Sequence, residues 1–92
     1  MLERDIEAKA VVTAKAYGWI GYKFTSPARA SVPDRLFLRE GRAVFIEFKS
    51  EKGRNTPGQE REQARIRAAG FECYVCRSVK EALDALGIVS PV

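Results

Sequence analysis

The chain has 92 residues, of which 46% are hydrophobic and 30% charged, and its formal net charge is +4. This length suits one domain, predicted here to span residues 1–92, and the composition is that of a globular protein rather than a disordered chain. No apolar run approaches the roughly 18 residues that a membrane helix needs, and the acidic, mixed start of the sequence is unlike a signal peptide. We therefore expect a cytoplasmic protein.

The N-terminal region predicts a helix followed by a strand. Over residues 2–16 an apolar residue recurs at every fourth position, which is helical spacing. These residues are Leu2, Ile6, Ala10 and Ala14. Residues 19–24 alternate in character and predict a half-buried strand. Its faces carry Ile20, Tyr22 and Phe24 on one side and Trp19, Gly21 and Lys23 on the other. Residues 25–32 form a predicted loop.

A β-hairpin is predicted next. Residues 35–38 and 43–49 read as strands, joined by a polar turn in which Gly41 can take a positive φ. Side chains alternate between the two faces of a strand, so Glu47 and Lys49 must share one face. The apolar side chains between them point into a core, and these are Val44, Ile46 and Phe48.

The C-terminal half predicts a helix, a strand and a second helix. Residues 56–59 (Thr-Pro-Gly-Gln) combine an N-cap, a proline at the first helical position and a capping-box glutamine, and the helix runs to Ala69. Residues 71–77 read as a strand, and residues 78–81 as a second capping box before a short helix. The third and fourth strands are far enough apart in sequence for a right-handed parallel crossover. The prediction is an α/β fold, a mixed four-stranded sheet flanked by helices in the order αβββαβα.

Asp34 and Glu47 are the best candidates for a metal site. Asp34 follows Pro33 at the start of one hairpin strand, and Glu47 lies near the end of its partner, so the hairpin brings the two carboxylates together. Carboxylates bind hard divalent cations, and the neighbouring Lys49 can orient a water or offset charge on a phosphate. The alternative is that Glu47 and Lys49 are ordinary exposed residues on an edge strand and Asp34 a turn residue.

Basic residues gather after this motif and favour a polyanionic partner. They are Lys49, Lys52, Arg54, Arg61, Arg65 and Arg67. Lys52 and Arg54, in the loop after the third strand, are the clearest candidates for phosphate contact, and Arg29 and Arg61 are further ones. The helical arginines could equally form a solvated face with neighbouring glutamates.

Cys73 and Cys76 do not indicate a zinc or redox site. A tetrahedral zinc needs further ligands, and the chain has neither a histidine nor a third cysteine. Both lie in an apolar, strand-like run, which favours two small side chains in the fold's interior or at an edge.

The motif residues resemble the PD-(D/E)xK nuclease superfamily and, more closely, its virus-type replication-repair nuclease (VRR-NUC) family. The resemblance runs from Glu7 to about Ser78 and covers the segments 32–38, 41–42, 45–49 and 56–59. It implies a restriction-endonuclease-like fold. Two positions depart from the family pattern. Ser31 stands where glycine is frequent, and Arg35 where an apolar residue is common.

The resemblance also implies a role for each site residue. Asp34, Glu47 and the backbone carbonyl of Phe48 would ligate Mg²⁺ or Mn²⁺, and Lys49 would position or activate the attacking water. Gln59 would hold the site or the water, although its capping box alone would explain it. Glu7 matches the family's additional acid on the first helix, where Glu3 and Asp5 are nearby alternatives.

The function implied is a Mg²⁺- or Mn²⁺-dependent DNA endonuclease that leaves 5′-phosphate and 3′-hydroxyl ends. Free-standing viral-type relatives resemble Holliday-junction resolvases, and one small domain cuts a symmetric substrate most simply as a twofold dimer. We therefore expect a homodimer acting on branched DNA, in the bacterial host cell if the chain is phage-encoded. The alternatives are a noncatalytic nucleic-acid-binding module and a flap- or nick-directed nuclease working with a helicase partner.

Overall fold

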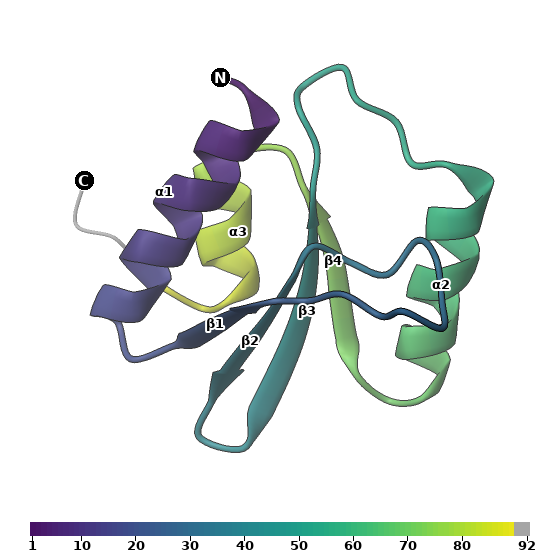
Figure 1. Ribbon diagram of the computed structural model, residues 1–92. Helices are drawn as coiled ribbons and strands as arrows, with labels where there is room; N and C mark the ends of the chain where they lie inside the picture. Colours follow the sequence, from purple (N-terminus) through teal and green to yellow (C-terminus); the bar gives the residue numbers. More distant parts are fainter. Residues whose placement is uncertain (90–92) are drawn as a thin grey trace.

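One four-stranded sheet organises the chain, and its strands lie side by side in sequence order. The computed structural model describes residues 1–89. The strands are β1 (Ile20–Lys23), β2 (Arg35–Arg39), β3 (Arg42–Phe48) and β4 (Glu72–Cys76). The first three are antiparallel, and β4 runs parallel to β3. Helices α1 (Glu3–Ala16) and α3 (Val79–Ala85) lie on one face and α2 (Pro57–Ala68) on the other (Figure 1). The predicted fold class and element order are confirmed.

The main core lies between the sheet and the pair α1 and α3. Phe37 of β2 and three alternate residues of β3 are fully buried, and the β3 residues are Val44, Ile46 and Phe48. From α1, the buried residues are Ile6, Ala10 and Ala14, whereas Leu2 precedes the helix and is 58% exposed. The alternation predicted for the third strand is therefore confirmed, and Glu47 is left on the face opposite this core.

The hairpin register brings the predicted site residues together. Glu40 and Gly41 have φ values of +48° and +78°, the left-handed pair required by the tight two-residue turn that suits a twisted hairpin. Arg35 pairs with Ile46, so one further step along both strands sets Asp34 opposite Glu47. The sequence gap between the two acids is thus closed by strand pairing alone.

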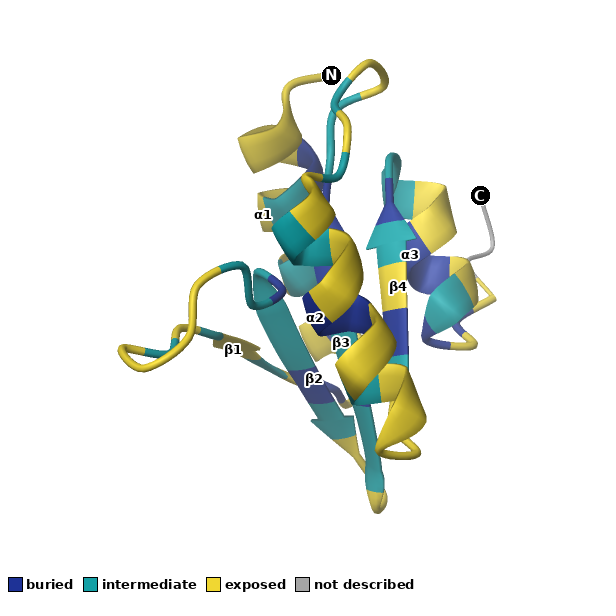
Figure 2. Cartoon of the chain, turned by 90° about the vertical axis from the view of Figure 1, so that its right-hand side faces the viewer, coloured by how far each residue is buried: buried dark blue, intermediate teal, exposed yellow. Residues whose placement is uncertain are grey.

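The structure shows which of the two predicted faces of β1 is buried. Trp19, just before it, is buried, whereas Ile20 and Tyr22 are 54% and 55% exposed. The reason is that α2 packs against β4 and does not reach β1, which lies beyond the edge of the helix in Figure 2. One side of β1 is therefore an open apolar surface.

The C-terminal helix has half of its predicted capping box. Ser78 Oγ accepts from the backbone N–H of Glu81, as expected, but the Glu81 carboxylate accepts from the N–H of Arg77 rather than from that of Ser78. The Glu81 carboxylate thus binds the backbone of Arg77, the residue before the N-cap. This hydrogen bond connects the end of β4 to the first turn of α3.

The two cysteines are free and buried. Being three apart on β4, they point to opposite faces, and burial raises the pKa of Cys73 to about 11 and that of Cys76 to about 12. Both thiols are therefore protonated near neutral pH, as suits packing side chains. Among residues 1–89, no helix has the length and apolar character needed to cross a membrane.

Candidate functional site

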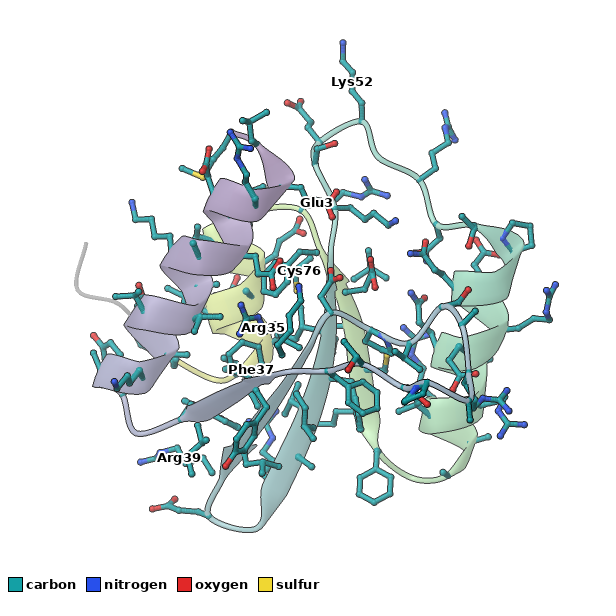
Figure 3. The ribbon with its side chains drawn as sticks, in the orientation of Figure 1. Glu3, Arg35, Phe37, Arg39, Lys52 and Cys76 are labelled. Atoms are coloured by element: carbon teal, nitrogen blue, oxygen red, sulfur yellow. The ribbon has the colours of Figure 1, made fainter. Side chains whose placement is uncertain are left out.

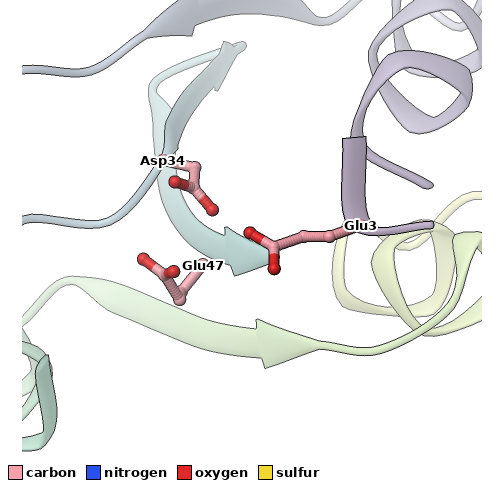
Figure 4. Close-up of side chains that lie close together, drawn as sticks. All are labelled: Glu3, Asp34 and Glu47. Atoms are coloured by element: carbon pink, nitrogen blue, oxygen red, sulfur yellow. The ribbon is translucent and has the colours of Figure 1, made fainter. Parts of the chain in front are cut away.

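Three carboxylates converge at the end of β3. Glu3 from α1, Asp34 before β2 and Glu47 of β3 each offer an oxygen, and these oxygens all lie within 4.8 Å of one another (Figure 4). The three residues come from separate segments of the chain, and the hairpin and α1 bring them to one point. Such a group of oxygen ligands is what Mg²⁺ and Mn²⁺ prefer.

Glu47 is the most strongly perturbed acid of the group. It is 3% exposed, and its nearest cation is Lys49, with Nζ 3.6 Å from Oε2. Burial and the adjacent Asp34 raise the pKa of Glu47 from 4.5 to about 7, while Lys49 opposes the rise. The positive charge of Lys49 therefore does not offset the cost of ionising a buried carboxylate that lies next to Asp34. A divalent cation would supply the missing positive charge.

Asp34 is oriented by the backbone of the neighbouring strand. Its Oδ2 accepts a hydrogen bond from the N–H of Phe48 at 2.8 Å, and its own carbonyl accepts from the N–H of Phe24 at 2.9 Å. A residue's N–H and C=O point to the same side of a strand, so the carbonyl of Phe48 is also directed toward Asp34. This is the direction that the predicted carbonyl ligand requires.

Gln59 forms hydrogen bonds both within its capping box and with the carboxylate group. Its side-chain oxygen accepts from the N–H of Thr56 at 3.0 Å and completes the capping box of α2. Its side-chain nitrogen donates to Glu47 Oε2 at 3.3 Å. The amide thereby links the start of α2 to the site, because its donor and acceptor ends serve different partners.

Glu7, the acid predicted from the resemblance, lies outside the carboxylate group. Its Oε2 accepts from Arg35 Nε at 2.6 Å and from Lys23 Nζ at 3.1 Å. Although burial alone would raise the pKa of Glu7, these two cations lower it. Glu3, one helical turn earlier, stands where Glu7 was expected. Arg35, one of the two departures from the family pattern, is the residue that binds Glu7 most closely.

The second departure, Ser31, is explained by backbone geometry. Its φ is +68°, in the left-handed region where glycine carries no steric penalty. The segment before Pro33 therefore needs the conformation that glycine adopts most easily, and serine adopts it here.

The basic residues fall into two groups. Lys52 and Arg54 are exposed in the β3–α2 loop, and neither forms an ion pair with any of residues 1–89. Figure 3 shows Lys52 at the tip of this loop, pointing away from the sheet. Arg29, by contrast, lies 3.0 Å from the buried Glu62 and fastens its loop to α2. Arg61 is exposed beside that pair and lines the same shallow pocket.

Arg77, which sequence reasoning missed, shapes the basic loop. Its Nη1 donates to the carbonyl of Ser50 at 2.9 Å and also to that of Gly53. Lys52 and Arg54 flank Gly53, so the loop that carries them is anchored to the end of β4. No local motif identifies this role, because it depends on β4 lying next to β3.

The chain has recognisable relatives. No protein-family model matches it. It is 43% identical over 77 residues to "Putative nuclease p44" of Acyrthosiphon pisum secondary endosymbiont phage 1, which covers 83% of each sequence. It is also similar to a solved structure described as "VRR_NUC domain", with a TM-score of 0.82 and 29% sequence identity, over 92% of this chain and 94% of that chain.

Proposed function

The chain belongs to the VRR-NUC family of PD-(D/E)xK nucleases, and from this premise we propose a divalent-metal-dependent endonuclease that hydrolyses phosphodiester bonds in branched DNA. The observation that carries the proposal is the convergence of Glu3, Asp34 and Glu47 next to Lys49. In a noncatalytic binding module, clustered carboxylates would only repel the phosphates of the bound nucleic acid. The proposed enzyme is a single domain over residues 1–92, of which 90–92 lie outside the described residues.

The donor set fits a hard divalent cation. We propose Glu3, Asp34, Glu47 and the carbonyl of Phe48 as its ligands, with Glu3 in place of Glu7. All are oxygen donors, and the sequence contains no histidine, so Mg²⁺ or Mn²⁺ is favoured over zinc. When bound, such an ion supplies Lewis acidity for phosphodiester hydrolysis and charge to offset the buried carboxylates.

The remaining site residues position the reacting groups. The Lys49 ammonium, beside Glu47 and only 12% exposed, orients the attacking water and balances charge on the phosphate. Gln59 holds the Glu47 carboxylate in place through its amide N–H. Hydrolysis by in-line attack leaves a 5′-phosphate and a 3′-hydroxyl.

Lys52 and Arg54 form the proposed DNA contact, because they are exposed and have no acidic partner among residues 1–89. Arg61, exposed on the first turns of α2, extends this surface toward Arg29. Contacts of this kind bind phosphates and set orientation without reading bases. We therefore propose recognition of DNA shape rather than sequence. The proposed location is the cytoplasm, that of a bacterial host if the chain is phage-encoded.

We propose that the enzyme acts as a homodimer, which supports paired cuts in a symmetric junction. The open face of β1 is the candidate interface. Exposed Ile20 and Tyr22 pair across the sheet with half-buried Leu36 and Leu38, which forms a continuous apolar patch. Gel filtration should give the mass of two chains, and Tyr22→Lys should give one. Val12→Lys, at an apolar residue 70% exposed on α1, is the control and should leave the dimer intact.

Substrate choice decides between the proposal and its rivals. Labelled four-way junction, flap, nicked, duplex and single-stranded DNA would each be incubated with Mg²⁺, Mn²⁺ or EDTA. Junction cleavage that requires a metal ion is the expected result. Preferential cutting of flaps or nicks, or cutting only with a helicase present, would favour the alternative nuclease.

A Lys49→Ala variant tests the site itself. It should lower the cleavage rate by about 10² to 10⁴ while DNA binding persists, because the water-positioning ammonium is lost. Lys15→Ala, at an exposed lysine in the last turn of α1, is the matched control. If the wild-type protein binds junctions but cuts them with neither Mg²⁺ nor Mn²⁺, the proposed enzymatic function is refuted. The noncatalytic binding module would then be the supported function.

A further inference from the structure

Among the described residues, no hydrogen bond or ion pair fixes the side chain of Glu3. It lies in the first turn of α1, ahead of Ile6, the first α1 residue buried in the core. Within residues 1–89 it forms neither an ion pair nor a side-chain hydrogen bond. Its place beside Asp34 and Glu47 therefore depends on how the start of α1 is held against the sheet.

Glu7 connects the start of α1 to the sheet. It follows Glu3 by four residues, so the two side chains share one helix face, about 6 Å apart along the helix axis. Its carboxylate accepts from Arg35 of β2 and Lys23 of β1, which are directly opposite each other in the sheet. The Arg35 and Glu7 side chains are only 22% and 13% exposed, so this ion pair is shielded from solvent.

Arg35 is also the residue that follows Asp34. The Arg35–Glu7 pair therefore joins α1 to the start of β2. Glu7 lies about one helical turn from Glu3, and Arg35 lies one residue from Asp34. Figure 3 shows Arg35 between α1 and the sheet. We propose that Arg35, acting through Glu7, is a positioning residue that holds Glu3 within reach of the metal site.

This inference rests on the proposed function, and its test measures metal affinity without DNA. Titration calorimetry with Mn²⁺ would compare wild type with Arg35→Met and with Glu7→Gln. Each variant should bind about tenfold more weakly, which is typical when the support of a ligand is removed. Arg39→Met is the matched control, because Arg39 lies on the same strand and pairs with Glu40 far from the site. It should bind Mn²⁺ as wild type does.

A double-mutant cycle with Glu3→Gln separates positioning from a general effect on the fold. If Arg35 acts through Glu3, Arg35→Met should weaken Mn²⁺ binding no further in the Glu3→Gln background. A full additional loss there would overturn the inference. If Arg35→Met impairs folding, Glu7→Gln is used in its place, because glutamine has nearly the same shape as glutamate.

The wild-type titration distinguishes failure of this inference from failure of the proposed function. Wild-type affinity in both Arg35→Met and Glu7→Gln, with weakened binding in Glu3→Gln, would overturn the positioning role alone. Wild-type protein that does not bind Mn²⁺ would overturn the proposed metal chemistry and this inference with it.

Discussion

Replacing Glu47 by glutamine should stabilise the metal-free protein at alkaline pH while abolishing cleavage. Glu47 is buried next to Asp34, and the pKa of its carboxyl is raised from 4.5 to about 7, mainly by burial. The folded state thus holds this proton more tightly than the unfolded state. The contribution of this carboxyl to stability is therefore fully present below about pH 4.5 and is lost as the pH rises through 7.

The size of the effect follows from that pKa. At 1.36 kcal/mol for each pKa unit, the ionised carboxylate costs roughly 3 kcal/mol at pH 8. Glutamine removes this cost and can still accept from Gln59, but it loses the attraction of Lys49. We expect Glu47→Gln to gain about 1 to 3 kcal/mol at pH 8 and little below pH 4.5.

Urea unfolding at a series of pH values, in EDTA, measures this difference. Glu51→Gln, at an exposed glutamate in the β3–α2 loop, is the matched control and should change stability little at any pH. Saturating Mg²⁺ should then stabilise wild type by about 3 kcal/mol at 100 times its Kd and leave Glu47→Gln unchanged. A variant less stable than wild type at pH 8, or a gain independent of pH, would refute the reasoning.

Two further substitutions test the local geometry. Gln59→Glu should preserve helix capping, since glutamate also serves in a capping box, yet lose cleavage because it sets a carboxylate against Glu47. Gln59→Ala should lose both functions, with stability lower by about 1 kcal/mol in urea unfolding. If both variants cleave normally, the contact with Glu47 has no role. Ser31→Gly should raise the free energy of unfolding by up to about 1 kcal/mol, because φ at this position is +68°. A clear loss of stability would show that the serine side chain matters more than the backbone angle.

The hairpin and its two site residues were accessible from sequence because they depend on local rules. Alternation along β3 put Glu47 and Lys49 on one face, and the turn at Gly41 fixed the register that brings Asp34 opposite Glu47. The capping residues of α2 could also be identified, since Thr56 and Gln59 act within a single turn. In each case the interacting groups are close in sequence or joined by one short turn.

The open face of β1 illustrates what local rules omit. Ile20 and Tyr22 alternate as strand residues should, but alternation does not reveal whether a helix covers them. Only the position of α2 against β4 leaves this face uncovered. Burial of a strand depends on distant segments, whereas its periodicity does not.

The sequence by itself determined the fold class, the hairpin and the pairing of Asp34 with Glu47, because these follow from periodicity and turn geometry. The tertiary structure decided which acid of the first helix joins them. Glu3 and Glu7 lie on the same helix face, so the sequence alone does not separate them. In the folded chain Arg35 binds Glu7, while the start of α1 brings Glu3 to the end of β3.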